Sequence, residues 1–98
     1  MLIPGLPLVT NTTLTNVNTE VVITLPANCK KFTLQARQNA DLKFSYTESA
    51  SGTIYFTIKA GNSYFEDNIR TNNKIYIQSP SAGTIVEMVV WSGGDDIL

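Results

Sequence analysis

The residue types that most enzyme chemistry needs are almost absent from this chain. It has no histidine and a single cysteine, Cys29. Because Ser–His and Cys–His pairs both need an imidazole, nucleophilic catalysis of that kind is excluded. Two carboxylates at a fixed separation would be enough for glycoside hydrolysis. The eight carboxylates are scattered, so we predict solvated surface charges and no catalytic residue among Glu20, Asp41, Glu48, Glu66, Asp67, Glu87, Asp95 and Asp96.

One short segment, Glu66-Asp67-Asn68, is the best candidate for a metal site, because carboxylate and amide oxygens bind calcium. It lacks the spaced acidic positions and the glycine of a recognised calcium loop, so a plain polar loop is the expected structure. A lone Cys29 cannot form an internal disulfide. The sequence therefore predicts no metal, no cofactor and no enzymatic activity.

The composition describes a neutral, polar surface on a single domain. The chain has 98 residues, a net charge of −1 and only 15% charged residues. Nucleic-acid binding would need a basic patch, which the few dispersed Lys and Arg residues do not supply. No apolar run approaches the length of a membrane span, and the start has no positively charged leader, so we expect synthesis in a cytoplasm. A net charge this small favours association over self-repulsion.

Apolar and polar residues alternate along most of the chain, which is typical of strands with one buried face. Turn signals recur roughly every 8–12 residues and separate about eight short strands, and no window favours a helix. We therefore predict an all-β fold, a small antiparallel β-sandwich that is jelly-roll-like, with the strand order left open. The predicted core contains Ile23, Leu34, Phe44, Ile54, Phe56, Ile58, Ile75 and Ile77.

The two ends of the chain differ from its centre. Residues 1–10 are apolar and broken by Pro4 and Pro7, which excludes a helix and favours an extended arm. Residues 93–98 begin with two glycines and are expected to form a flexible tail. The predicted sandwich domain spans residues 11–92. The arm is a candidate interface through Leu2, Ile3, Leu6, Leu8 and Val9.

The final strand, expected over residues 84–91, has apolar residues on both faces. Its outer face carries Ile85, Val89 and Trp91, with Glu87 between them. Exposed apolar residues in such a row mark a covered surface, and either the N-terminal arm or another subunit would cover it. A carboxylate under such a cover needs a charged partner, and we expect Arg37 to pair with Glu87. Ile85, Val89 and Trp91 complete the predicted interface.

Three segments resemble small β-rich structural proteins of tailed-phage virions: KKFTLQARQNADLKFSYT, FTIKAGNSYFEDN and KIYIQSPSAGTIVEMVVWS. The shared pattern is an arginine before an ADL turn, an AGxxY turn, and a YxxSxxAGxxVE segment closed by tryptophan. The resemblance covers roughly residues 30–92. Its matching positions are Arg37, Ala40, Asp41, Leu42, Ala60, Gly61, Tyr64, Tyr76, Ser79, Ala82, Gly83, Glu87 and Trp91.

This resemblance implies a virion component without enzymatic activity. We expect a capsid decoration or cement protein that is made in the host cytoplasm, docks on the shell and stabilises it. Its partners would be phage capsid or other virion proteins, and it would be a homo-oligomer or an assembly subunit. Two alternatives stay open: a tail, neck or fibre component that binds host glycans through exposed tyrosines, and a cellular carbohydrate-binding module.

Overall fold

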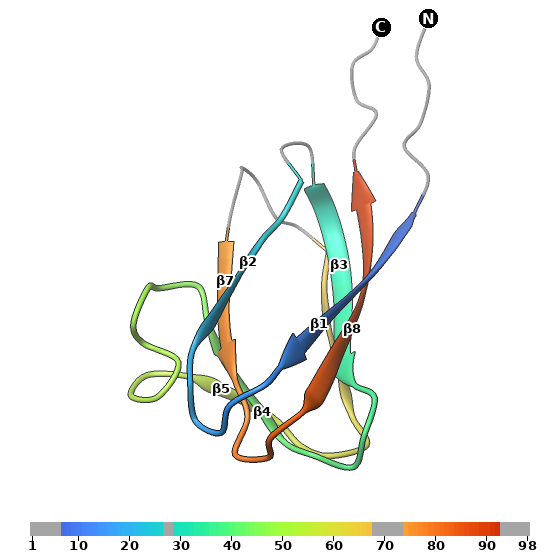
Figure 1. Cartoon of the computed structure of the whole chain (residues 1–98). Helices are drawn as coiled ribbons and strands as arrows, with labels where there is room; N and C mark the ends of the chain where they lie inside the picture. The colour runs from blue at the N-terminus through green and yellow to red at the C-terminus, as the bar shows by residue number, and fades with distance from the viewer. Residues whose placement is uncertain (1–6, 27–28, 68–73, 93–98) are drawn as a thin grey trace, which may run out of the picture.

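The computed structural model describes residues 7–26, 29–67 and 74–92, and within them the chain forms strands, turns and no helix (Figure 1). The strands lie in two four-stranded antiparallel sheets. Their bounds are β1 Leu8–Leu14, β2 Val21–Thr24, β3 Cys29–Ala36, β4 Leu42–Ser45, β5 Phe56–Ile58, β6 Ser63–Glu66, β7 Lys74–Gln78 and β8 Thr84–Ser92. The prediction of an all-β sandwich of about eight short strands is confirmed.

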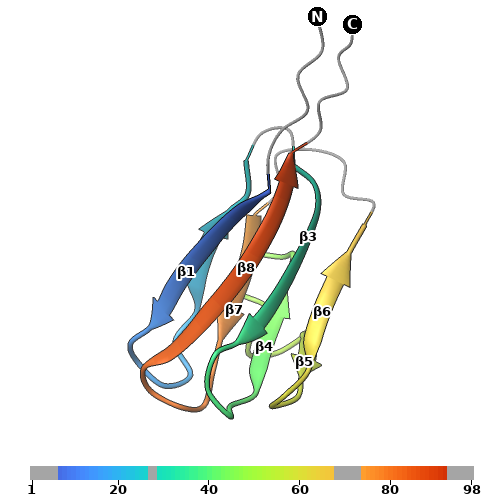
Figure 2. The same cartoon turned by 90° about the vertical axis from the view of Figure 1, so that its right-hand side faces the viewer.

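The strand order is that of a jelly roll. One sheet has the order β1-β8-β3-β6 and the other β2-β7-β4-β5 (Figure 2). Strands 1 and 8, 2 and 7, 3 and 6, and 4 and 5 are therefore paired, as in a long antiparallel ribbon that is rolled into two layers. This order is the part of the fold that alternation along the chain does not specify.

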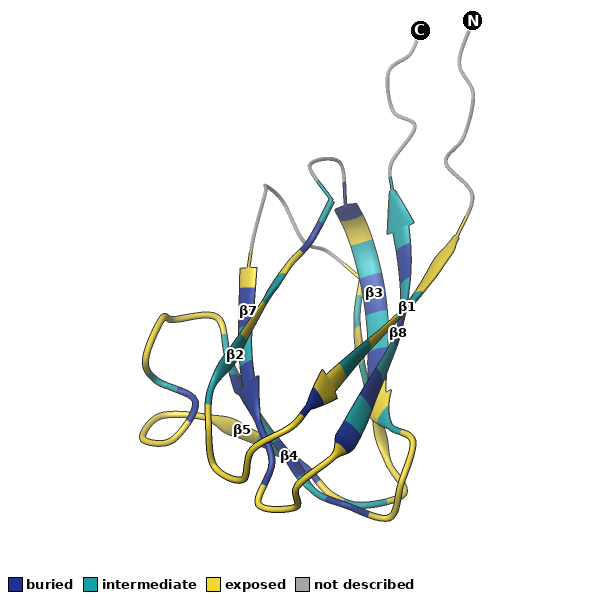
Figure 3. Cartoon of the chain, in the orientation of Figure 1, coloured by how far each residue is buried: buried dark blue, intermediate teal, exposed yellow. Residues whose placement is uncertain are grey.

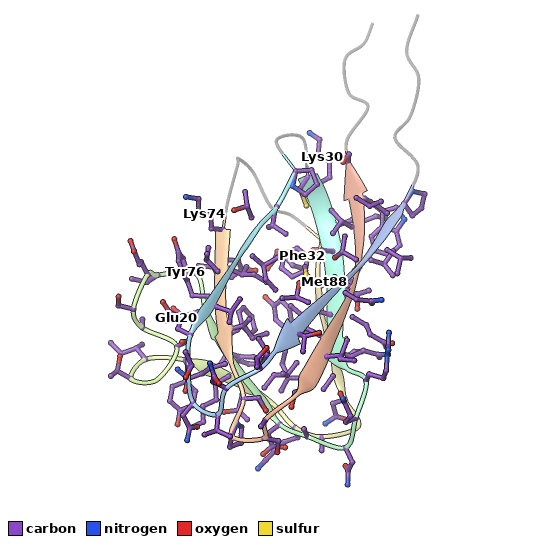
Figure 4. The ribbon with its side chains drawn as sticks, in the orientation of Figure 1. Glu20, Lys30, Phe32, Lys74, Tyr76 and Met88 are labelled. Atoms are coloured by element: carbon purple, nitrogen blue, oxygen red, sulfur yellow. The ribbon has the colours of Figure 1, made fainter. Side chains whose placement is uncertain are left out.

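The core lies between the sheets, where every second residue of each strand points inward. Phe32 and Leu34 of β3 face Ile75 and Ile77 of β7, and all four are fully buried. The alternating bands of burial along β3 and β8 are visible in Figure 3, and Figure 4 shows Phe32 between the sheets. Of the predicted core, the buried members are Leu34, Phe44, Ile58, Ile75 and Ile77, and Ile23 packs partly buried against them.

Two residues of the predicted core lie at the surface: Ile54 is 80% exposed and Phe56 is 54% exposed. The alternation of Ile54, Phe56 and Ile58 placed all three in the predicted core, but β5 begins only at Phe56. The amides of Thr53 and Ile54 instead donate to the carbonyl of Ala50, at 3.0 and 2.9 Å, and this turn keeps Ile54 out of the sheet. Phe56 lies on the edge strand β5, where only one side is covered.

The boundary of the predicted arm is also wrong. Residues 8–10 are the first part of β1, where Leu8 pairs with Val90 and Val9 with Val89. The physical reason is that β8, nine residues long, has an edge that β1 can hydrogen-bond along its whole length. The sandwich therefore includes residue 8. Leu2, Ile3, Leu6 and the predicted tail over 93–98 lie outside the described residues.

Candidate binding surfaces

The outer face of the β1-β8-β3-β6 sheet carries an apolar band across all of its strands. The pairing registers place four residues in one cross-strand row: Val9, Val89, Thr33 and Phe65. Val9 is 66% exposed and Phe65 is 53% exposed, while Val89 and Thr33 in the middle of the row are half-buried. Trp91 lies on the same face, two residues beyond Val89. We call these five residues the outer band.

Trp91 is held in place by neighbours on both sides. Its ring meets the ring of Phe65 edge-on, with centroids 6.3 Å apart. The ammonium of Lys31, which pairs with Trp91 across the strands, lies 5.2 Å from the indole centroid. Such a cation–π contact orients an indole that remains partly solvated. The outer band is therefore an ordered aromatic surface with a cation at its rim.

Next to the outer band lies a polar cluster on the same face. Glu87 accepts from the guanidinium Nε of Arg37 at 2.7 Å and from the amide of Gln35 at 3.0 Å. These hydrogen bonds, that from Gln35 first and that from Arg37 second, lower the pKa of Glu87 below its usual value. The structure thus brings together the two residues expected to pair. Both remain partly exposed, at 48% for the Arg37 side chain and 30% for Glu87.

The structure separates other residues that the sequence grouped together. Leu8 and Val9 are neighbours on a strand, so their side chains point to opposite sides, and only Val9 joins the outer band. The N-terminal segment from Leu8 onward lies beside β8 in the sheet and not over its outer face. Within the described residues this face has no covering layer. The expectation that the arm covers it is therefore wrong for residues 8–10, which lie in the sheet itself. Ile85 lies on this face, half-buried, near Arg37.

Sequence reasoning missed Phe65 and Lys31 as members of this surface. The available signal was the adjacent pair Tyr64-Phe65, since two aromatic residues in one strand must face opposite sides. Tyr64 takes the inner side, where its ring lies 4.8 Å from that of Phe44. The position of Phe65 beside Trp91 could not be predicted from the sequence, because it depends on β6 and β8 both pairing with β3.

A second candidate surface is an aromatic pocket of about 310 Å³ at the opposite side of the sandwich from β1. It forms where the edge strand β5 of one sheet approaches the edge strand β6 of the other, as the contact between the Phe56 and Tyr64 rings shows, with centroids 5.4 Å apart. The pocket is lined by Phe44, Ser45, Tyr46, Ile54, Tyr55, Phe56 and Tyr64.

One wall of this pocket belongs to the loop between β4 and β5, which a hydrogen-bond network holds in place. Glu20 accepts from the backbone amides of Ser49 at 2.8 Å and Ser51 at 3.1 Å, and also from the Ser51 hydroxyl. Gln78 donates to the same hydroxyl at 2.9 Å. Ser51 is fully buried, and Ser49 has a φ of 66°, a conformation that non-glycine residues rarely adopt. Figure 4 shows Glu20 just before β2, on the side of this loop.

Two opposing effects act on the ionisation of Glu20. Its partial burial raises the pKa, but the hydrogen bonds from Ser51 and Ser49 outweigh that effect, and the pKa is lowered. The carboxylate is therefore ionised at neutral pH and accepts from both serines. The network, made of Glu20, Ser49, Ser51 and Gln78, is a structural anchor for the loop that carries Ile54 and Tyr55.

Among the described residues, no three His, Cys, Asp or Glu side chains lie close enough to hold a metal ion. Of the predicted polar loop, Glu66 ends β6, whereas Asn68 lies outside the described residues. Over the same described ranges, no helix is long and apolar enough to cross a membrane.

The fold and the two surfaces define this chain as a small jelly-roll protein with an apolar sheet face and an aromatic pocket. Comparison with protein-family models, with curated proteins and with solved structures found no match.

Proposed function

We propose that the protein is a non-enzymatic structural component of a tailed-phage virion, most simply a capsid decoration or cement protein. It would be made in the host cytoplasm and would dock on the shell through the outer face of the β1-β8-β3-β6 sheet. The observation that carries this proposal is the outer band, which is apolar except for Thr33 and crosses a sheet face that no described residue covers.

The energetics of this face suit repeated docking better than a single tight contact. Full burial of a large apolar side chain contributes about 1.5–3 kcal/mol, and Val9 and Phe65 still have half or more of their surface to bury. Association costs roughly 4–15 kcal/mol in lost freedom, so one such face gives modest affinity. Many copies on a repeating shell, or an oligomer of this chain, would convert that affinity into avidity.

The polar cluster next to the outer band suits the rim of an interface. Arg37 and Gln35 both donate to Glu87, so a partner meets an ordered set of donors and acceptors. Interfaces of this kind combine an apolar, aromatic centre with a polar rim and are enriched in Arg and aromatic residues. The cluster would orient the docked protein, whereas the outer band would supply the buried area.

The fold and the sequence resemblance support the proposal at a coarser level. Jelly rolls occur in viral capsid proteins, and they also occur in lectins and cupins, so the architecture alone does not decide the function. The resemblance over residues 30–92 favours the virion. A tail, neck or fibre location is the second candidate. Copy number separates the two locations, because a shell protein is present in far more copies than a tail protein.

The test is quantitative mass spectrometry of purified phage particles, followed by two matched variants. Val9→Asp places a charge in the outer band, and Val22→Asp places one on the outer face of the other sheet, where Val22 is 51% exposed. We expect Val9→Asp to reduce the copies per particle and Val22→Asp to leave them unchanged, with both proteins folded by circular dichroism. Absence of the protein from particles, or equal incorporation of both variants, would refute the proposal.

A further inference from the structure

The aromatic pocket exposes apolar side chains that neither the core nor the outer band explains. Ile54 and Phe56 are 80% and 54% exposed, and Tyr46 and Tyr55 are exposed as well. Four apolar or aromatic side chains left side by side in water do not add to the stability of the fold. Clusters of this kind mark binding sites. The pocket volume of about 310 Å³ is at the lower end of the range for small-molecule sites, about 300–1,000 Å³.

The rings of the pocket form a rigid platform. The buried ring of Phe44 is the centre, with the centroids of Tyr46, Phe56 and Tyr64 at 5.6, 5.7 and 4.8 Å, all in edge-on contact. Edge-on packing fixes each ring against its neighbour. The exposed ring of Phe56 is therefore supported by Phe44 and Tyr64, and it offers a ligand a surface that is ordered in advance.

The polar groups in and around the pocket include both donors and acceptors. The hydroxyls of Tyr64 and Tyr46 both donate to the same oxygen of Glu66, at 2.8 and 3.4 Å. Burial is the largest cause that raises the pKa of both phenols, and both stay neutral. The hydrogen bond between the two phenols follows, raising the pKa of Tyr46 and lowering that of Tyr64, so the Tyr64 oxygen already accepts from Tyr46. The Tyr46 oxygen is therefore the phenol acceptor that is left for a ligand.

Charges of both signs flank the pocket. The Glu66 carboxylate lies behind the two phenols, and the ammonium of Lys43 lies 4.8 Å from the centroid of the Tyr55 ring. An anionic ligand would meet repulsion from Glu66, and a cationic one would meet repulsion from Lys43. A neutral ligand avoids both penalties and can accept a hydrogen bond from the ammonium or from Ser45, whose oxygen accepts from the Thr47 amide at 3.0 Å.

We propose that the aromatic pocket binds a neutral saccharide residue, whose apolar C–H face packs on Phe56 and whose hydroxyls donate to the phenol oxygen of Tyr46 and accept from Lys43 or Ser45. A pyranose has one face of C–H groups, which carry partial positive charge and suit the negative face of an aromatic ring. Its hydroxyls both donate and accept, which suits a rim that offers the Tyr46 oxygen as an acceptor and Lys43 and Ser45 as donors. This inference does not depend on a location in the virion.

A proline-rich peptide is the main competitor, since such peptides dock in aromatic-lined grooves. Proline lacks an N–H, so a proline-rich segment presents carbonyl acceptors and needs donors from the protein. Lys43 and Ser45 could supply such donors, but a segment without N–H groups has nothing to donate to the Tyr46 oxygen. The hydrogen-bond pattern therefore favours a ligand with many hydroxyl groups over such a peptide.

The experiment is saturation-transfer difference NMR with the purified full chain and a panel of neutral, amino and acidic oligosaccharides at millimolar concentration, with a proline decamer as the peptide probe. We expect binding by neutral saccharides, with the strongest transfer to protons of one C–H face. Aromatic stacking of a flat ligand is lost on alanine substitution with about fivefold or greater weakening, which is the expected effect of Phe56→Ala.

Phe65→Ala is the matched control, because Phe65 is 53% exposed, as Phe56 is, but belongs to the outer band. Tyr46→Phe keeps the ring and removes one acceptor, so it should weaken binding while the protein stays folded, with a small fall in melting temperature from the lost hydrogen bond to Glu66. Binding by no neutral member of the panel would overturn the proposal. So would preference for charged sugars or for the proline decamer, or equal affinity in wild type and Phe56→Ala. Each of these outcomes leaves docking through the outer band unaffected.

Discussion

Glu20→Gln should weaken the hydrogen bonds that hold the loop forming one wall of the aromatic pocket, and so destabilise the protein. One Glu20 oxygen accepts from the Ser49 amide and the other from the amide and hydroxyl of Ser51. Glutamine retains a single oxygen, which can still serve Ser51, but its NH2 group then faces the Ser49 N–H. One hydrogen bond is therefore lost outright, and two change from a charged to a neutral acceptor.

The magnitude follows from that count. A hydrogen bond to a charged group contributes about 1.5–3 kcal/mol and one between neutral groups about 0.5–1.5 kcal/mol. At the lower ends of these ranges the lost bond and the two weakened ones sum to about 3.5 kcal/mol. Because the Glu20 side chain is partly solvated, we expect a smaller total loss of about 2–3 kcal/mol. For a domain of this size the melting temperature should fall by about 10–20 °C, and the variant should remain folded at room temperature.

The assay is urea unfolding at about pH 7 and about pH 3, with Glu48→Gln as the control. Glu48 lies in the same loop and is exposed, so its variant should match wild type within about 0.5 kcal/mol. Because the pKa of Glu20 is lowered by folding, its stabilisation is complete above the unfolded-state value and is lost as pH falls through the folded-state value. The gap between wild type and Glu20→Gln should therefore shrink at acid pH. The reasoning would be refuted if the two proteins had the same free energy of unfolding at neutral pH, or if the difference between them stayed the same in acid.

Two further predictions concern the core and the polar cluster. Phe32 is fully buried, so Phe32→Ala should cost about 3–5 kcal/mol in urea unfolding, whereas Phe56→Ala should cost clearly less; equal losses would contradict the assigned core. Arg37→Met and Glu87→Gln should leave the melting temperature of the free protein nearly unchanged, since water solvates both partners. On particles, docking would remove water from the Arg37 or Glu87 side chain that remains after a single substitution. Either single variant should therefore be present in fewer copies per particle than the double variant. Additive reductions in copy number would show that the pair is not buried in the docked state.

The sequence was informative where local pattern and burial agree. In β3, β7 and β8 the period of two coincides with a strand that has neighbours on both sides, so apolar residues at alternate positions had to face the core. Residues such as Leu34, Ile75 and Ile77 were read correctly for that reason. The Arg37–Glu87 contact was also readable, because a carboxylate among apolar neighbours needs a charged partner.

The pattern was misleading at the edges of the sheets. The alternation Ile54, Phe56, Ile58 is the most regular in the chain, yet only Ile58 is buried. The turn at Ala50 and the position of β5 at an edge remove Ile54 and Phe56 from the core. An edge position is a property of the whole sheet, and local periodicity carries no information about it.

By itself the sequence determined an all-β domain and part of its core, because period-two alternation and turn residues are properties of short segments. Only the tertiary structure decided the strand order, which depends on pairings between segments far apart in the chain, such as β1 with β8. The candidate surfaces follow from that order. Val9 and Phe65 share one row because β8 and β3 lie between their strands, and Phe56 meets Tyr64 because rolling the ribbon brings two sheet edges together.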